Sequence, residues 1–284
     1  MKPARAYTIF IHVAAVLMGV VILGPFLWLF ISSISPAKEL ISVPFHWFPS
    51  HPTISRFKDI FLQSANGENV SANFRVSMVN SFIVATGTTF ISILVGSLGA
   101  YAFARLKFRF RRTMLFGFLS VYMLPPIVLV IPLYLIIANM GLLDTKLGLI
   151  ITYCSLITPF TLWTMSNYFR TLPADLEEAA RVDGCTRLGA FFRIVIPLSK
   201  PGLFASALFA FLLAWDEFLF ALIFTSTTNS KTIPVAIAEF AGKYSSDYGL
   251  VCAGGVLAAL PPVILALIFQ KNIVGGLTAG SVKG

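Results

Sequence analysis

Long uninterrupted apolar segments constrain this chain more than any other feature of its sequence. A helix needs roughly 20 apolar residues to cross about 30 Å of hydrocarbon. Six segments reach that length, at residues of about 9–32, 79–104, 113–137, 147–169, 203–225 and 250–269. Their apolar residues are continuous and do not alternate, and a backbone in hydrocarbon must satisfy its own hydrogen bonds, so we expect α-helices. The sequence predicts an all-α membrane protein with six transmembrane helices in a single domain, residues 1–284.

The composition agrees with a bilayer as the solvent. Hydrophobic residues make up 57% of the 284 residues and charged residues 12%, with a mean hydropathy of +0.85, which is outside the usual range of soluble domains. The first apolar segment follows Lys2 and Arg5 and could be read as a signal peptide. It is too long for the apolar region of a signal peptide and no AxA-like cleavage site follows it, so we expect a retained span.

The distribution of basic residues predicts the orientation. If the N-terminus is cytoplasmic, 14 of the 21 lysines and arginines fall in cytoplasmic segments and 7 in outer segments. Cytoplasmic loops of membrane proteins carry such an excess of basic residues, so both termini are expected to be cytoplasmic. The net charge of +9 then reflects topology and gives no reason to expect nucleic-acid binding.

No catalytic or metal-binding pattern occurs in the chain. Cys154, Cys185 and Cys252 have no CxxC spacing, the three histidines form no pair at metal-binding spacing, and HExxH and GxSxG are absent. No GxxxxGK[ST] loop occurs either, so this chain is not expected to bind ATP through a P-loop. We predict no catalytic residue, no metal site, no cofactor and no enzyme activity; an energy source would have to lie on another protein.

The most polar stretch lies in a predicted cytoplasmic loop of about residues 170–200. Pro173 can occupy the first turn of a helix whose acidic residues Asp175, Glu177 and Glu178 lie near its positive end. Gly184 is the residue expected where that helix ends in a left-handed turn, and Thr186 can cap the next helix. A short charged helix with small residues can dock another protein. The alternative is an amphipathic helix that lies on the bilayer and contacts no protein.

The sequence EEAARVDGCTRLGAFFRIVIP resembles the EAA loop of permease subunits in bacterial ABC importers. That pattern is EAA, three residues, Gly, nine residues and I-x-L-P, and this chain departs from it only at Ile196. The resemblance implies a type I ABC importer (MetI-like) permease fold and a helix that contacts the ATP-hydrolysing subunit. The residues implied to couple to that subunit are Glu177, Glu178, Ala179, Ala180, Asp183 and Gly184.

Three further segments, VPFHWFPSHPT, AWDEFLFAL and GLTAGSVKG, are similar to carbohydrate importers of the maltose-permease type. The resemblance implies a subunit of a binding-protein-dependent sugar importer, multi-pass in the bacterial inner membrane. Its implied partners are a second homologous permease, two ATP-binding subunits that hold ATP and Mg, and an extracytoplasmic solute-binding protein. The sugar substrate and the lipid bilayer are also expected partners.

Asp216 and Glu217 are the only acidic residues within a predicted span. Charges in a membrane normally face a cavity or a partner, so these carboxylates are candidates for the sugar path, with Trp215 stacking on a sugar ring. Alternatively, they form an inter-helix hydrogen bond that positions the fifth span. A different function class would use them as the ion relay of a self-sufficient secondary transporter, but the two halves of the sequence show no convincing repeat.

Two features of the remaining segments are candidates for gating and docking. Pro125 and Pro126 interrupt the third span and are expected to shape a gate. The outer loops are predicted at about residues 33–77 and 226–249. By analogy with maltose-type permeases, the second of these loops, with Lys243 and Tyr244, contacts the binding protein; the alternative is a passive surface loop.

Overall fold

The computed structural model describes residues 5–44, 46–61, 70–243 and 248–278, and within these residues the chain forms helices and connecting turns without a strand. In chain order the elements are α1 (Arg5–Ile34), α2 (Ala37–Leu40), α3 (Ser55–Phe61), α4 (Val70–Arg105), α5 (Arg111–Ser120), the 3₁₀ turn η1 (Val121–Met123), α6 (Pro126–Asn139), α7 (Lys146–Thr171), α8 (Asp175–Val182), α9 (Arg187–Ala190), the π-helical turn η2 (Phe191–Val195), α10 (Ile196–Leu198), α11 (Lys200–Trp215), α12 (Leu219–Phe224), α13 (Ile233–Lys243) and α14 (Tyr248–Thr278). The predicted all-α class is confirmed.

The chain divides into two compact units. The first comprises Met1–Arg75 and Ala236–Leu260, and the second comprises Val76–Val235 and Pro261–Gly284. The long helices α4 and α14 each contribute to both units. The sequence predicted one permease domain over residues 1–284. Whether the two units form one domain is not tested, so this stays a prediction.

In the first unit, a buried arginine ties α3 to the end of α1. The side chain of Arg56 is 6% exposed and donates hydrogen bonds to the carbonyl oxygens of Ser33, at 3.3 Å, and Ser35. A cation is favoured at the C-terminal end of a helix, where carbonyl groups lack partners within the helix. Gly249 leaves room for this side chain, because a Cβ there would lie 2.1 Å from Cζ of Arg56.

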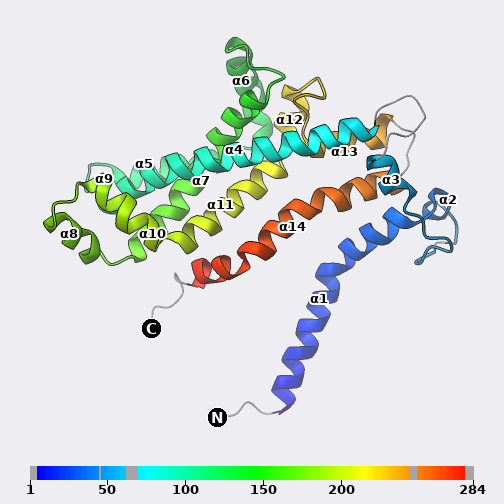
Figure 1. Ribbon diagram of the computed structural model, residues 1–284, viewed down its shortest axis with the longest axis horizontal. Helices are drawn as coiled ribbons and strands as arrows, with labels where there is room; N and C mark the ends of the chain where they lie inside the picture. The colour runs from blue at the N-terminus through cyan, green and yellow to red at the C-terminus, as the bar shows by residue number, and fades with distance from the viewer. Residues whose placement is uncertain (1–4, 45, 62–69, 244–247, 279–284) are drawn as a thin grey trace. The chain divides into compact units, whose positions relative to one another are not determined.

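In the second unit, α7 packs between α4 and α11, and Figure 1 shows these three helices running alongside one another. Small residues allow the close approach: a Cβ at Gly96 of α4 would lie 2.8 Å from Thr161 of α7, and one at Gly202 of α11 would lie 2.6 Å from the ring of Tyr168. Such contacts between small residues are typical of helices packed in membranes.

Four described helices are long and apolar enough to cross a membrane, and the number rises to six if each of two bent helix pairs counts as one span. The four are Ile9–Ile34, Asn73–Arg105, Lys146–Thr171 and Tyr248–Lys271. They correspond to the first, second, fourth and sixth predicted spans. Helix α4 begins at Val70, well ahead of the predicted start at residue 79, so its first turns fall in what was expected to be an outer loop.

The third predicted span, residues 113–137, is not one continuous helix. It consists of the α5–η1 segment and α6, which meet at 100°. Leu124 and Pro125 both adopt extended backbone angles, as expected for residues that each precede a proline. Pro126 then starts α6, where its missing N–H costs nothing. Leu124 and Pro125 therefore form the break, and Pro126 is the first residue after it.

The fifth predicted span, residues 203–225, is also interrupted. Helix α11 ends at Trp215 and the short helix α12 begins at Leu219, while the segment Arg187–Leu198 enters α11 at an angle of 81°. The outer loop predicted at residues 226–249 contains a helix, α13, of 11 residues. Hydropathy alone did not indicate these breaks.

Candidate functional site

The polar helix predicted after Pro173 is α8. It begins at Asp175, so Pro173 precedes the helix and does not lie in its first turn; the acidic residues of that turn are Asp175, Glu177 and Glu178. At the other end, the Gly184 N–H donates to the carbonyl of Arg181 at 3.1 Å and the Cys185 N–H to that of Ala180 at 3.0 Å. With Gly184 at a φ of +89°, this is a Schellman cap, whose left-handed residue is usually glycine.

The two neighbouring glutamates of α8 have different surroundings. Glu177 is half-buried: its carboxylate lies 3.2 Å from Nε of Arg105 and accepts a hydrogen bond from the hydroxyl of Tyr101. Arg105 also donates to the carbonyl of Leu172 at 3.0 Å. Glu178 is exposed. Glu177 therefore holds α8 against the end of α4, whereas Glu178 is open to solvent.

The six predicted coupling residues thus separate into two groups. Ala180 lies on the buried side of α8, and the Glu177 carboxylate pairs with Arg105 of α4. The residues Glu178, Ala179, Asp183 and Gly184 are exposed. The second group forms one small, mildly acidic surface, which we call the α8 face. A bare helix flank with two carboxylates is suited to close contact with another protein surface.

Tyr101 and Arg105 are functional candidates that the sequence interpretation did not include. They lie four residues apart in α4, so they share one face of the helix. Both are located where an apolar segment ends in a basic residue, next to the predicted loop. A Tyr-x-x-x-Arg pattern at that position would have been the available signal for an anchoring pair.

The segment that follows α8 is fixed by an aromatic core. Thr186 caps α9 as predicted, since its hydroxyl accepts a hydrogen bond from the Gly189 N–H at 3.0 Å. Phe191 is 1% exposed, and its ring centroid lies 4.9 Å from that of Tyr101 and 6.2 Å from that of Phe169. The widened turn η2 precedes Pro197, which cannot donate to the carbonyl four residues back. Through Tyr101, this core and the anchor of α8 are continuous.

A small polar pocket of about 130 Å³ lies where α4 meets α8 and α9. It is lined by Arg105, Leu106, Ala174, Glu177, Glu178, Arg181 and Arg187. Three arginines and two glutamates give it mixed charge. A single polar side chain of another protein would fit such a volume and find partners of either sign.

The predicted path residues lie at the break between α11 and α12. Trp215 is 2% exposed and stacks on Phe211 with ring centroids 5.5 Å apart, whereas Asp216 is exposed. The Glu217 carboxylate accepts hydrogen bonds from the N–H groups of Phe220, at 2.9 Å, and Ala221, at 3.1 Å, and so caps α12. Of the three residues, Asp216 is exposed, Glu217 is partly exposed and Trp215 is buried, and the path role of all three stays a prediction.

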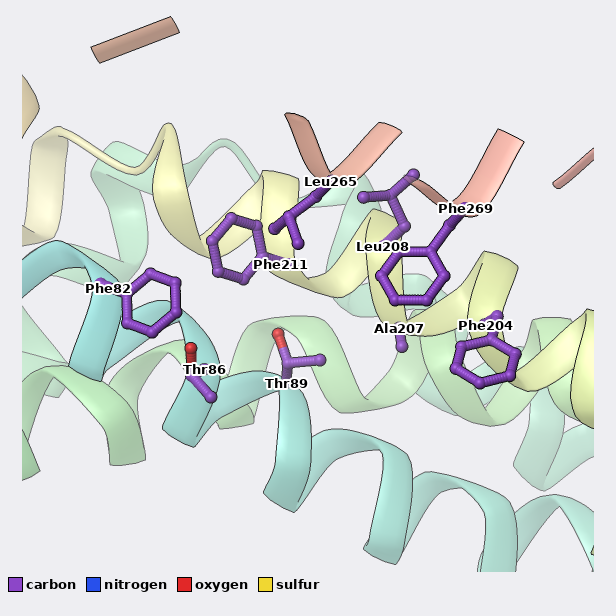
Figure 2. A pocket seen from close by; sticks show the side chains of 9 residues that line it. All are labelled: Phe82, Thr86, Thr89, Phe204, Ala207, Leu208, Phe211, Leu265 and Phe269. Carbon is purple, nitrogen blue, oxygen red and sulfur yellow. The ribbon is translucent and has the colours of Figure 1, made fainter. Parts of the chain in front are cut away.

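An apolar cavity lies among α4, α11 and α14 (Figure 2). It measures about 300 Å³ and is lined by Phe82, Thr86, Thr89, Phe204, Ala207, Leu208, Phe211, Leu265 and Phe269. Figure 2 shows the hydroxyl-bearing side chains of Thr86 and Thr89 among the aromatic rings. Trp215, Asp216 and Glu217 do not line this cavity. Trp215 stacks on Phe211, which does.

The other predicted sites are placed as follows. Pro125 and Pro126 lie at the bend between η1 and α6 described above. Their role in a gate stays a prediction. Tyr244 and the side chain of Lys243 lie outside the described residues, so the predicted binding-protein contact stays a prediction. Among the residues that the structure describes, no group of three His, Cys, Asp or Glu side chains could hold a metal ion.

Comparison with known proteins gives one family and several relatives. The family described as "Binding-protein-dependent transport system inner membrane component" matches residues 89–278. The sulfoquinovosyl glycerol transport system permease protein SmoH of Agrobacterium fabrum is 37% identical, over 100% of this chain and 94% of its own length. The trehalose transport system permease protein SugB of Mycobacterium tuberculosis is also 37% identical, over 99% of both chains.

A solved structure supports the same fold. A chain of a bacterial ABC transporter involved in the import of the acidic polysaccharide alginate matches with a TM-score of 0.76 and 25% identity. The match covers 95% of this chain and 99% of the other. The matched family region contains α8, the anchor residues of α4 and the cavity of Figure 2 except for Phe82 and Thr86.

Proposed function

We propose a sugar-importing role from the premise that this chain belongs to the family of binding-protein-dependent transport system inner membrane components. It is a multi-pass permease subunit of the inner membrane. The relatives named above carry a sulfoquinovosyl glycerol and a trehalose permease name, and the solved relative belongs to an alginate importer. All three substrates are glycosides, so the proposed substrate class is a sugar or a small glycoside.

The α8 face is the observation that carries the proposed mechanism. A permease that has no nucleotide-binding loop of its own needs a mechanical contact with an ATPase, and α8 offers an exposed face on a helix that is anchored from behind. Glu178 and Asp183 are available to basic groups of a partner, while Glu177 and Ala180 are covered by this chain. In this mechanism ATP and Mg bind to the partner, whose closure moves α8.

The anchor gives the movement a route into the membrane. Glu177 connects α8 to Arg105 and Tyr101 at the end of α4, and Tyr101 packs on Phe191 in the aromatic core. A displacement of α8 would therefore be transmitted to α4 and, through Phe169, to α7. Packed cores respond to such a displacement by moving as bodies and not by continuous deformation. A second homologous permease would complete the sugar path, with two ATP-binding subunits on one side and a solute-binding protein on the other.

An ion-driven secondary transporter has less support from the geometry. Both carboxylate oxygens of Glu217 accept backbone hydrogen bonds at the start of α12. A relay carboxylate must release and rebind its ion, and protonation of Glu217 would weaken the bonds that cap this helix. The structural role of Glu217 therefore argues against its use as the relay.

The test uses the chain assembled with its partner permease and ATPase in proteoliposomes. Glu178→Arg reverses the charge of the α8 face and should lower ATP-dependent sugar uptake at least tenfold, which corresponds to about 1.4 kcal/mol. It should also weaken co-purification of the ATPase. Lys107→Glu, a charge reversal at another exposed loop position, is the matched control and should assemble normally.

Glu177→Gln separates docking from transmission. Gln can still accept from Tyr101, but it leaves Arg105 without its carboxylate, so the ATPase should still bind while less sugar is transported per ATP hydrolysed.

Normal uptake and assembly of the Glu178→Arg variant would contradict the docking role. Uptake that continues with an inactivated ATPase would instead support the secondary transporter.

A further inference from the structure

A dense polar cluster lies at the end of α7 opposite α8, and the coupling mechanism does not use it. Asp144, in the turn before α7, adopts a φ of +56°. Its Oδ1 accepts hydrogen bonds from the N–H groups of Ser226, at 2.8 Å, and Thr227, at 3.0 Å, and from the hydroxyl of Ser230. The Asp144 N–H donates to the carbonyl of Phe224 at 2.8 Å. One side chain thus fixes the start of the loop that follows α12.

Lys146 and Asn80 hold the middle of the same loop. Nζ of Lys146 donates to the carbonyl of Asn229 at 2.6 Å and to Oδ1 of Asn80 at 3.1 Å. Nδ2 of Asn80 donates to the carbonyls of Thr228, at 2.9 Å, and Lys231, at 3.0 Å. Lys146 is the first residue of α7, a position where the helix dipole disfavours a cation. Its hydrogen bonds to the loop, and not the helix, account for a lysine there.

The end of the loop is held in the same way. The Ile233 N–H donates to the hydroxyl of Ser81 at 2.7 Å, and the Ile233 side chain is 1% exposed. Six backbone groups between Ser226 and Ile233 are therefore bonded to side chains from α4 or from the start of α7. The side chains of Ser226, Thr227 and Asn229 are exposed. Most surface loops solvate their backbone in water, whereas this one is ordered from beneath and presents polar side chains outward.

The position of the cluster identifies the side of the membrane that it faces. Helix α7 has 26 residues and is about 39 Å long at 1.5 Å per residue, enough to cross a bilayer. The cluster lies at its N-terminal end and α8 follows its C-terminal end. The loop is therefore on the opposite side of the membrane from the α8 face. A binding protein would deliver its sugar from the side of the loop.

We propose that Asp144, Lys146 and Asn80 are positioning residues that hold segment 226–232 as a preformed docking platform for the solute-binding protein. This inference rests on the proposed function. Binding to a mobile loop costs the entropy of ordering it, whereas an ordered loop has already lost that freedom during folding. The platform presents hydroxyl and amide groups, so the matching surface of the binding protein is polar and neutral and is not an apolar patch.

The experiment measures ATPase stimulation in the complete reconstituted complex. The probe is the cognate solute-binding protein, saturated with the sugar that it binds in a thermal-shift screen. Asp144→Gly removes the acceptor and still permits the positive φ. This variant should raise the binding-protein concentration for half-maximal stimulation about tenfold, equivalent to about 1.4 kcal/mol, with the basal ATPase rate unchanged. Hydrogen exchange in segment 226–232 should become faster.

Two variants serve as comparison. Asp144→Asn keeps a neutral acceptor and tolerates the left-handed backbone, so its half-maximal concentration should lie between those of the wild type and Asp144→Gly. Asp59→Asn makes the same chemical change at an exposed position of α3 and should behave as the wild type.

Three results would overturn the inference. In the first, hydrogen exchange becomes faster in Asp144→Gly but the half-maximal binding-protein concentration stays the same. In the second, the basal ATPase rate and the assembly of the complex fall in the same proportion as the stimulation, which would indicate a structural role only. A wild-type complex that the binding protein does not stimulate would overturn the proposed function as well. The first two results leave the proposed function intact, so the two failures are distinguishable.

Discussion

At the scale of single residues, the environment of each carboxylate decides what it does. Glu177 and Glu178 are adjacent and chemically identical, yet one is paired with Arg105 and the other is exposed. Adjacent residues of an α-helix point about 100° apart, so only one of the two can face α4. The EAA pattern begins at Glu178, and the predicted coupling set contained both glutamates without distinguishing their roles. The anchor at Tyr101 and Arg105 is what assigns them.

Asp144 allows a prediction about pH. Burial raises the pKa of its carboxyl, but hydrogen bonds from the Ser230 hydroxyl and from the N–H groups of Thr227 and Ser226 outweigh burial and hold the pKa well below its usual value. A carboxyl whose folded pKa is lowered contributes stability that is complete above the unfolded pKa of about 3.9 and is lost as the pH falls through the folded pKa. Between pH 8 and pH 5 the Asp144 contribution should therefore not change.

Hydrogen exchange checks this expectation. After correction for the intrinsic pH dependence of exchange, the protection of segment 226–232 should be equal at pH 8 and pH 5. A loss of protection by pH 5 would mean that a group other than Asp144 controls the loop.

At the scale of helices, the sequence predicted which segments are apolar but not where the helices bend. The continuous helices α4 and α7 were predictable as long apolar runs; α4 has no interior proline, and α7 continues through its single one, Pro159. The third segment bends because Leu124 and Pro125 each precede a proline and avoid the helical region. The fifth ends early because Glu217 caps a new helix from within an apolar run. Hydropathy averages over a window and therefore misses both causes.

The candidate site divides in the same way. The Schellman cap at Gly184 and the Thr186 cap were predictable, since each depends on a local residue preference. The Glu177 anchor and the Asp144 cluster were not, because each joins residues far apart in the chain: Tyr101 and Glu177 are 76 positions apart, and Asp144 and Ser226 are 82 apart. No local pattern specifies which distant groups will meet.

The contact between α4 and α7 leads to a prediction about glycines. A Cβ at Gly96 would lie 2.8 Å from Cγ2 of Thr161 and 3.3 Å from the backbone nitrogen of Leu162, which cannot move aside. A Cβ at Gly87 would lie 2.9 Å from Cδ1 of Ile150, the flexible end of a side chain. Gly96→Ala should therefore destabilise the protein by about 1–3 kcal/mol. Gly87→Ala should cost less, because the end of the Ile150 side chain can move aside; the gain in helix propensity of about 1 kcal/mol is common to both variants.

Thermal unfolding of the purified chain in detergent measures the difference. Gly117→Ala in α5 is the control, since a Cβ there meets no atom within 4 Å, and it should leave the midpoint unchanged or slightly raised. Equal midpoints for the Gly96 and Gly87 variants would show that α4 and α7 can separate at little cost, against the close packing seen here.

At the scale of the whole molecule, the α8 face and the loop after α12 lie at opposite ends of α7. The α8 face is anchored through α4 at one end, and the loop after α12 is fixed to α4 and α7 at the other. Both ends therefore use the same two helices as support. A contact made at one end can influence the other through α4 itself and through the packing of α4 against α7, so the proposed coupling between binding protein and ATPase should depend on these two helices.

The orientation of these two ends is the prediction that the whole arrangement depends on. The 14-to-7 distribution of basic residues places α8 inside and the loop after α12 outside. Cys185 lies just after α8 and is partly exposed, so it reports on one side. In a Cys154→Ala, Cys252→Ala background expressed without the ATPase, a membrane-impermeant maleimide should label Cys185 only when the cytoplasmic face is open to the reagent.

The opposite side is reported by Asn229→Cys in a chain that lacks all three native cysteines. Asn229 is exposed and contributes only its backbone carbonyl to Lys146, so the substitution keeps the loop in place. The same reagent should label this cysteine in intact spheroplasts. Because α7 separates the two positions, labelling of both from one side would mean that α7 does not cross the bilayer. Labelling with the sides exchanged would place the α8 face outside, where no ATP is available, and the coupling mechanism would then be wrong.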